Sequence, residues 1–230
     1  MDQSAAVKTV ERALDQGRGA LTEYEAKQVL AAYDIPVTRE ILIQSPEGLK
    51  QAAQEIGFPL VLKACSADLA HKTEKNMVRV DLRSMDEAFA AFNEIIEQVG
   101  TQGEDSGVLV QEMISGKREL VLGMTRDPQF GPCVMFGLGG IFTEILKDIA
   151  FRKAPIDKDE ALRLMQDIQG RRILEAVRGM PAADTDMLAH MLIQIGRIGL
   201  DIEAVAEIDI NPVILDKSSP VAADALIVLS

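Results

Sequence analysis

Apolar residues recur along this chain with two different spacings, which predicts a mixture of helices and strands. Helical spacing follows Thr22 and Ser84, each of which starts a capping box with a glutamate three residues later. Ser45-Pro46 supplies a helix cap and a first-turn proline, which predicts a third helix. Two more helices are predicted over residues 158–168 and 186–199.

Short apolar or alternating runs predict strands between these helices. Residues 60–64 are apolar except for Lys63, which is typical of a buried strand. Residues 77–82 place Arg79 and Asp81 on one face, which indicates a half-exposed strand. The other predicted strands cover residues 41–43, 108–110, 119–124, 132–136, 204–210, 213–215 and 221–228. Because strands and helices do not alternate strictly, we expect an α+β fold with mixed sheets.

The chain is expected to divide into three parts. Residues 1–20 are polar with only a weak helical pattern, so we interpret them as an N-terminal arm. A break near residues 114–117 would separate a front lobe, residues 21–114, from a rear lobe, residues 115–230.

Composition narrows the class of protein. The 230 residues are 47% hydrophobic and 26% charged, which is typical of one large or two small globular domains. A net charge of −12 argues against nucleic acid or an anionic membrane as a partner, although a few local cations would suffice for a nucleotide. The first residues have no basic stretch leading into an apolar core, so we expect no signal peptide, and no apolar run approaches the roughly 20 residues of a spanning helix. Cys65 and Cys133 lie in apolar runs, as buried reduced thiols would, so we expect a cytosolic protein.

The common phosphate-binding loops are missing from the sequence. Gly116-Lys117 is followed by Arg118 rather than by Ser or Thr, so it is not a Walker A motif. The glycines at 137–140 do not have the Rossmann spacing. They indicate either a tight turn or a place where the backbone approaches a ligand closely.

Lys63 and the run at 207–211 are candidate binding residues. A lysine in an apolar strand needs compensation, either from a phosphate ligand or from a core carboxylate such as Glu119 or Glu144. On a strand, Glu207, Asp209 and Asn211 project from one face, and Pro212 is expected to end that strand. Their oxygens, with Asp224 on the last strand, suit Mg²⁺; the alternative is a solvated strand face at a sheet edge.

The chain has two histidines. His71 lies in a polar loop between two predicted strands and could accept a phosphoryl group on nitrogen, or it could simply be exposed. His190 lies in an amphipathic helix, which indicates a structural role.

Taken in order, these features resemble the ATP-grasp subunit of ADP-forming acetyl-CoA synthetases, relatives of succinyl-CoA synthetase. The resemblance covers nearly the whole chain, from about Leu21 to the end. It implies an ATP-grasp fold, with two lobes of mixed or antiparallel sheets and flanking helices that hold a nucleotide between them. The motifs that carry it are residues 21–27, 57–63, 71–73, 110–114, 136–144 and 209–212.

The resemblance also implies roles for individual residues. In the front lobe, Lys63 would neutralise the phosphates of ATP or ADP, and a hinge would read adenine through backbone groups of Glu112, Met113 and Ile114. In the rear lobe, Glu119 would hold the ribose hydroxyls, and the turn with Gly139 and Gly140 would line the phosphate site. Mg²⁺ would be bound by Asn211 and Asp224, with Asp209 or Glu207 assisting.

In this family an acyl-CoA and phosphate give an acyl phosphate, whose phosphoryl group passes through histidine to ADP. One histidine belongs to a CoA-binding alpha subunit, and His71 matches a second one in the nucleotide-binding subunit. Because this chain has no glycine-rich CoA domain, the alpha subunit would be a separate chain or a fused segment.

One departure concerns the loop after His71. The family usually has two glycines where this chain has Asn76 and Met77, and methionine adopts a left-handed conformation poorly. This altered loop favours one alternative, a non-catalytic ATP-binding regulatory module. Another ATP-grasp carboxylate ligase is a further alternative, which fits Lys63 and the acidic strand but gives His71 no purpose.

Overall fold

The computed structural model describes residues 3–67, 77–99, 106–140, 148–177 and 179–230. The chain forms two compact units, which we call the front unit and the rear unit. The front unit consists of Thr22–Tyr24 and Thr38–Met113, and the rear unit of Met1–Leu21, Glu25–Val37 and Ile114–Ser230. Residues 25–37, which the sequence assigns to the front lobe, thus belong to the rear unit, and helix α2 (Glu23–Ala32) contributes to both.

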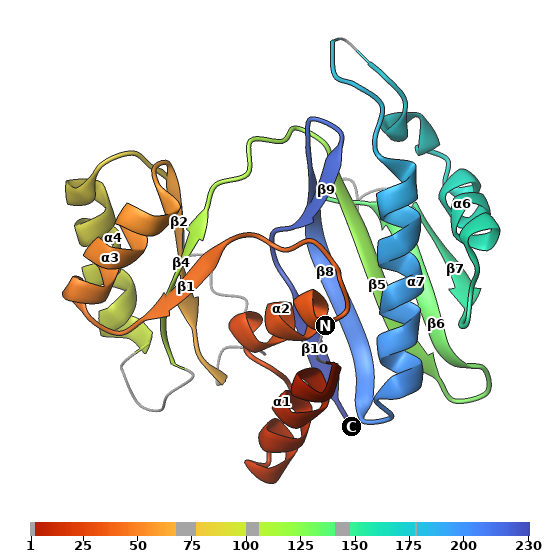
Figure 1. The fold of residues 1–230 in the computed structure, drawn as a ribbon, viewed down its shortest axis with the longest axis horizontal. Helices are drawn as coiled ribbons and strands as arrows, with labels where there is room; N and C mark the ends of the chain where they lie inside the picture. Colours follow the sequence, from red (N-terminus) through yellow and green to blue (C-terminus); the bar gives the residue numbers. More distant parts are fainter. Residues whose placement is uncertain (1–2, 68–76, 100–105, 141–147, 178) are drawn as a thin grey trace. The chain divides into compact units, whose positions relative to one another are not determined.

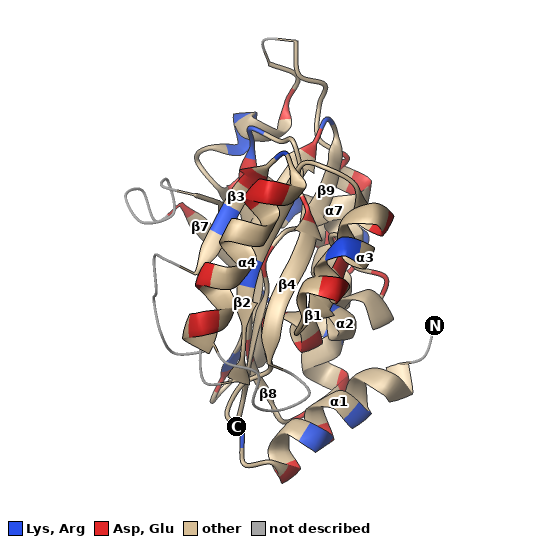
Figure 2. Ribbon diagram, turned by 90° about the vertical axis from the view of Figure 1, so that its left-hand side faces the viewer, with Lys and Arg blue, Asp and Glu red and all other residues tan. Residues whose placement is uncertain are grey.

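The front unit is a four-stranded sheet with two helices on one face. Its strands run in the order β1 (Glu40–Ile43), β4 (Gly107–Glu112), β2 (Leu60–Cys65), β3 (Val78–Leu82), and every adjacent pair is antiparallel. Figure 2 faces this unit and shows β4 between β1 and β2. Helices α3 (Pro46–Ile56) and α4 (Met85–Val99) bury Leu49, Phe92 and Ile95 against alternate residues of the strands.

Local sequence explains where α3 begins and ends. The Ser45 hydroxyl accepts a hydrogen bond from the Gly48 N–H at 3.2 Å, and Pro46 occupies the first turn. Gly57 ends the helix with a φ of 85°, a conformation that suits glycine. The predicted helix after Ser45-Pro46 is therefore confirmed.

The rear unit is built on a larger antiparallel sheet. The order is β10 (Leu226–Leu229), β8 (Val205–Asp216), β5 (Glu119–Asp127), β6 (Gly131–Leu138) and β7 (Ile149–Lys153), with β9 (Ser219–Ala222) also pairing with β8. Helices α6 (Lys158–Asp167) and α7 (Thr185–Asp201) cover one face of this sheet, as Figure 1 shows. The adjacent named strands of both sheets pair antiparallel, so the expectation of mixed sheets gives way to antiparallel ones.

The first residues of the chain fold against this core. Whereas the sequence predicts an arm over residues 1–20, helix α1 (Gln3–Asp15) buries Ala6, Val10 and Ala13 in the rear core. Glu25 of α2, assigned above to a capping box, is 1% exposed and accepts hydrogen bonds from Arg18 at 2.6 and 2.7 Å and from Arg12 at 2.9 Å. These ion pairs fasten α1 and the following turn to α2.

The prediction that Pro212 ends its strand is wrong. Strand β8 continues to Asp216, but its register with β5 steps from Ile210 to Val213. Pro212, which has no N–H group, falls at this irregularity, where no ladder hydrogen bond from it is needed. The predicted single strand over residues 221–228 is likewise two strands, β9 and β10, because both pair with β8 on either side of the same irregularity.

A buried arginine holds the connection between α6 and α7. Arg118 is 5% exposed and lies directly before β5. Its guanidinium donates to four backbone carbonyls at 2.7–3.3 Å, those of Ile173, Glu175, Pro181 and Lys217. The first carbonyl belongs to a 3₁₀ helix, η2 (Arg171–Leu174), so one side chain joins three separate segments of the rear unit.

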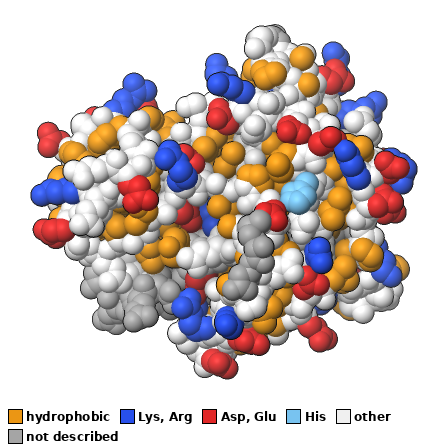
Figure 3. Space-filling model, viewed as in Figure 1, with side chains coloured by type: hydrophobic (Ala, Val, Ile, Leu, Met, Phe, Trp, Pro, Cys, Tyr) orange, Lys and Arg blue, Asp and Glu red, His pale blue; other side chains and the backbone are white. Residues whose placement is uncertain are grey.

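Surface properties agree with the composition. On the described part of the face drawn in Figure 3, basic and acidic side chains are interspersed. Within the described residues, none of the helices combines the length and the apolar character that crossing a bilayer requires.

Candidate functional site

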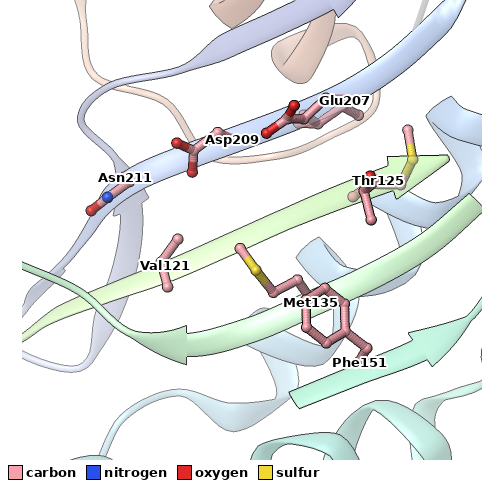
Figure 4. Close-up of a pocket in the computed structure, with 9 residues that line it drawn as sticks. Val121, Thr125, Met135, Phe151, Glu207, Asp209 and Asn211 are labelled. Atoms are coloured by element: carbon pink, nitrogen blue, oxygen red, sulfur yellow. The ribbon is translucent and has the colours of Figure 1, made fainter. Parts of the chain in front are cut away.

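The face of the rear sheet that α6 and α7 leave uncovered carries the oxygen-rich residues of β8. Ile208 and Ile210 are 1% and 0% exposed and belong to the core, so the alternate residues Glu207, Asp209 and Asn211 project from the other face. Figure 4 shows these three side chains in a row along the strand. The predicted alternation is present in the structure.

These side chains form one wall of a pocket of about 180 Å³. The opposite wall is apolar and comes from β5, β6 and β7, with Val121, Met135 and Phe151 (Figure 4). Thr125 adds a hydroxyl group at one end. A polar ligand with an apolar part would match both walls.

The electrostatics of the pocket favour a cation. Burial, together with the neighbouring Glu207 and Asp224 carboxylates, raises the pKa of Asp209 to about 6. A bound cation would relieve this repulsion. Among the described residues, no three His, Cys, Asp or Glu side chains form a complete ligand cage. The donors present, two carboxylates and an amide oxygen, fit Mg²⁺, which keeps phosphate and water ligands.

Asp224 lies between two strands rather than on one. It occupies the segment that links β9 to β10, two residues before Leu226, which pairs with Asp209. Its Oδ1 accepts a hydrogen bond from the Ala225 N–H at 2.8 Å. Its carboxylate is close enough to contribute to the pKa of Asp209, so Asp224, Asp209 and Glu207 act as one electrostatic group.

Glu119 and the glycine turn also lie together. The Gly139 N–H donates to the Glu119 carbonyl at 2.9 Å, and a side chain at residue 139 would place its Cβ 2.8 Å from backbone atoms of Glu119 and Leu120. Gly140 has a φ of 62°, and a Cβ there would overlap the Glu119 carboxylate. The turn at Gly139 and Gly140 approaches Glu119 so closely that both positions require glycine. The Glu119 carboxylate therefore lies beside a turn without side chains at these two positions.

Lys63 has a partner that the sequence did not suggest. Its Nζ lies 2.6 Å from Glu23 Oε1, and the two side chains are only 9% and 14% exposed. Glu119 or Glu144 was the carboxylate expected for this role. Glu144 lies outside the described residues, and Glu23 is the partner because the start of α2 lies against β2 within the front unit.

The predicted hinge, Glu112 to Ile114, is where the chain passes from the front unit to the rear unit. The Glu112 carboxylate binds the backbone N–H and the guanidinium of Arg39, at 2.9 and 2.8 Å. The N–H groups of Glu112 and Met113 donate to the carbonyls of Arg39 and Pro59. The side chain and these two N–H groups thus hold the hinge in place, and adenine recognition would depend on the other backbone groups.

Known proteins resemble this chain over its whole length. The ATP-grasp domain family matches residues 12–229. The beta subunit of ADP-forming acetate–CoA ligase I from Pyrococcus furiosus is 39% identical over 233 residues, which cover 100% of both chains. This chain belongs to the ATP-grasp family of ADP-forming acetate–CoA ligase beta subunits.

Two further relatives extend this ATP-grasp assignment. The ADP-forming acetate–CoA ligase I of Archaeoglobus fulgidus is 36% identical over 231 residues, which are 100% of this chain and 34% of that longer protein. The structure of dinucleotide-forming acetyl-coenzyme A synthetase 1 from Candidatus Korarchaeum cryptofilum, with coenzyme A and Ca-AMPCP, has a TM-score of 0.91 and 41% identity over 98% of this chain and 100% of that one. The same synthetase with Mg-AMPPCP and a phosphohistidine segment pointing towards the nucleotide-binding site has a TM-score of 0.86, with 40% identity at the same coverage.

The predicted phosphoryl carrier of this ATP-grasp chain, His71, lies outside the described residues, as does Asn76. Met77 is described. It is 9% exposed, and its carbonyl accepts a hydrogen bond from the Ala64 N–H at 2.9 Å. Through this hydrogen bond, Met77 extends the pairing of β3 with β2.

Sequence reasoning missed several residues of the candidate site. The alternation of side chains along β5, β6 and β7 would have placed Thr125, Met135 and Phe151 on the same sheet face as Asp209. Strand β7 was not predicted from the sequence. Its Ile149 and Phe151 are 38% and 45% exposed, so the strand lacks a buried apolar face that would mark it. Glu23 was overlooked because the motif at Thr22 was interpreted only as a helix cap.

Proposed function

We propose that this chain is the nucleotide-binding subunit of an ADP-forming acyl-CoA synthetase of the acetate type. It would transfer a phosphoryl group between ATP or ADP and a histidine in the reversible reaction acyl-CoA + ADP + phosphate = carboxylate + CoA + ATP. The observation that carries this proposal is the pocket on the open face of an ATP-grasp sheet, where Glu207, Asp209 and Asn211 line one wall. End-to-end similarity to an acetate–CoA ligase beta subunit supports the choice of reaction.

The roles of individual residues form part of this proposal. In the front unit, Lys63 would neutralise nucleotide phosphates, and backbone groups of Glu112, Met113 and Ile114 would read adenine. In the rear unit, Glu119 would bind the ribose hydroxyls, and the turn at Gly139 and Gly140 would leave room for the phosphates. Such a site acts by positioning and by charge neutralisation.

The divalent cation is proposed to be Mg²⁺, held by Asn211, Asp209 and Asp224. When bound, it would neutralise negative charge on the phosphate oxygens of the nucleotide and of the transferred phosphoryl group. The raised pKa of Asp209 supports this assignment, because burial and two neighbouring carboxylates disfavour its ionised form without a cation.

Two histidines would carry the phosphoryl group. One would belong to a CoA-binding alpha subunit that forms the acyl phosphate and releases CoA, and the other would be His71 of this chain. Phosphohistidine would then give its phosphoryl group to ADP, which regenerates neutral imidazole. The phosphohistidine segment of the Korarchaeum synthetase, which points towards its nucleotide site, supports a mobile carrier.

The cytoplasm is the proposed location, supported by two free cysteines.

The test combines this chain with a CoA-binding alpha subunit and measures cleavage of acetyl-CoA that requires ADP and phosphate. Incubation with labelled ATP should leave a base-stable, acid-labile phosphoryl group on His71. His71→Ala should abolish both the label and the cleavage, while His190→Gln, the same loss of an imidazole on helix α7, should preserve both. Nucleotide binding without label and without cleavage would instead assign the chain to the regulatory class.

A further inference from the structure

Lys63 forms an ion pair with a carboxylate on a neighbouring helix. Glu23 Oε1 lies 2.6 Å from Lys63 Nζ, and both residues belong to the front unit. Both side chains are nearly excluded from solvent, at 9% and 14% exposure. The pair is therefore a short, mostly desolvated ion pair rather than a surface contact.

The residues on either side of Glu23 are fixed to the same strand. The Cys65 thiol receives hydrogen bonds from the Tyr24 backbone and the Thr22 side chain, while its burial raises its pKa to about 11. Cys65 lies two residues after Lys63 on β2, so both side chains project from the same face. Thr22–Tyr24 is thus docked along one face of β2, with the Glu23 carboxylate at the ammonium group.

This arrangement has a consequence for phosphate binding. A lysine already paired at 2.6 Å has most of its charge compensated, so it attracts an approaching polyphosphate less than a lone ammonium would. The Glu23 carboxylate would also repel phosphate oxygens that came within the same distance of Nζ. A phosphate and this carboxylate therefore compete for one cation.

We propose that Glu23 is the resident counterion of the phosphate subsite, which a nucleotide phosphate displaces from Lys63. The proposal rests on the proposed function, because it takes Lys63 as a phosphate-binding residue. Without nucleotide, the carboxylate compensates the charge of a buried ammonium group and holds it in place, so the subsite is preformed. With nucleotide, the phosphate takes over the ammonium, and part of the binding free energy is used to release the carboxylate.

The competition would set the nucleotide affinity. A reversible phosphoryl-transfer subunit must release both ADP and ATP, and a counterion that returns to the cation weakens the bound state of either. Removal of the Glu23 charge should therefore tighten nucleotide binding, although it takes away a residue of the site. If Glu23 only positioned Lys63, removal of its charge would instead weaken nucleotide binding.

The experiment measures the dissociation constant of MgADP by calorimetry on the full chain. Glu23→Gln, which keeps the size and removes the charge, should bind MgADP about ten-fold more tightly than the wild type. Glu55→Gln on the exposed surface of α3 makes the same change in net charge and should leave the dissociation constant unchanged. In a Lys63→Met background, Glu23→Gln should have less than a two-fold effect, because the cation for which the carboxylate competes is gone.

The outcomes separate this inference from the proposed function. If no variant binds MgADP, the proposed function fails. If Lys63→Met weakens binding but Glu23→Gln leaves it unchanged or weakens it, only the counterion role is overturned. Should Glu23→Gln not fold, as judged by thermal unfolding, Glu23→Asp retracts the carboxylate by one methylene and should bind two- to three-fold more tightly; no gain there overturns the inference.

Discussion

Asp209 of β8 lies directly opposite Gly123 of β5, where the strand pairing leaves no room for a side chain on residue 123. A Cβ at residue 123 would lie 2.5 Å from the Ile208 carbonyl oxygen and 3.2 Å from Met135 Cε. Even alanine at residue 123 would therefore crowd the backbone of β8 next to Asp209, a residue that lines the pocket. Asp209 carries the central carboxylate of this pocket, and its protonation affects both stability and the proposed cation binding.

Asp209→Asn should separate stability from cation binding. The pKa of Asp209 is raised from 3.8 to about 6. At pH values between these two, Asp209 is protonated in the folded chain and ionised in the unfolded chain. The free energy of unfolding therefore falls as pH rises through this range, because folding then requires an ionised Asp209 in the pocket. Above about pH 6 the whole of this destabilisation is present. Because the carboxyl group keeps some contact with solvent, we expect the ligand-free variant to gain about 1 kcal/mol at pH 7.5 in urea unfolding, and nothing at pH 3.5.

The same variant should lose the stabilisation that MgADP gives the wild type. In the wild type, that stabilisation should shrink as pH falls from 7.5 to 5.5, because protonated Asp209 is a poor cation ligand. Glu203→Gln, an exposed carboxylate near the start of β8, serves as the control and should change neither result. Equal MgADP stabilisation of Asp209→Asn and wild type would remove Asp209 from the proposed metal site.

Gly139→Ala should damage the turn beside Glu119. The added Cβ would lie 2.8 Å from backbone atoms of Glu119 and Leu120, so the turn has to move. We expect a loss of about 1–3 kcal/mol in unfolding free energy and at least a ten-fold weaker affinity for ADP. Gly19→Ala is the matched control, because a Cβ there meets nothing within 4 Å. An unchanged ADP affinity in a folded Gly139→Ala variant would argue against the turn as part of the nucleotide site.

The ion pair of Lys63 and Glu23 should show non-additive stability. Lys63→Met removes the ammonium that lies 2.6 Å from the largely desolvated Glu23 carboxylate, and we expect a loss of about 3 kcal/mol in chemical denaturation. Glu23→Gln alone should also destabilise. The double variant should be more stable than Lys63→Met, because an amide tolerates an apolar neighbour better than a carboxylate does. Additive losses would show that the pair has no energetic coupling.

Much of the local structure could be predicted because it is encoded locally. Ser45-Pro46 and Gly57 define α3 through a hydroxyl cap, a fixed φ and a positive φ, none of which needs tertiary context. The alternation of Glu207, Asp209 and Asn211 with buried isoleucines follows from the period of a strand. These features placed the row of oxygens on one face of β8.

Other parts depend on contacts that are distant in sequence. Glu23 and Lys63 are 40 residues apart, and no periodicity links them. The continuation of β8 past Pro212 depends on an irregularity in its pairing with β5, which a single strand's sequence cannot reveal. Helix α1 looked like an arm because only Ala6, Val10 and Ala13 are buried, and alanine is a weak signal of a core position.

Arg118 offers a test of the architecture that is independent of nucleotide. Its guanidinium alone donates to four carbonyls from three segments, so Arg118→Met would leave buried acceptors without donors. We expect a loss of about 3 kcal/mol or more in unfolding free energy, together with faster amide exchange and proteolysis between η2 and α7.

Arg163→Met on the exposed side of α6 is the same chemical change and should cost less than about 0.5 kcal/mol. Arg118→Lys should recover only part of the loss, because an ammonium has three donors at one point and cannot span carbonyls that a planar guanidinium reaches. Equal exchange rates between η2 and α7 in wild type and Arg118→Met would mean that the backbone holds this connection without the arginine.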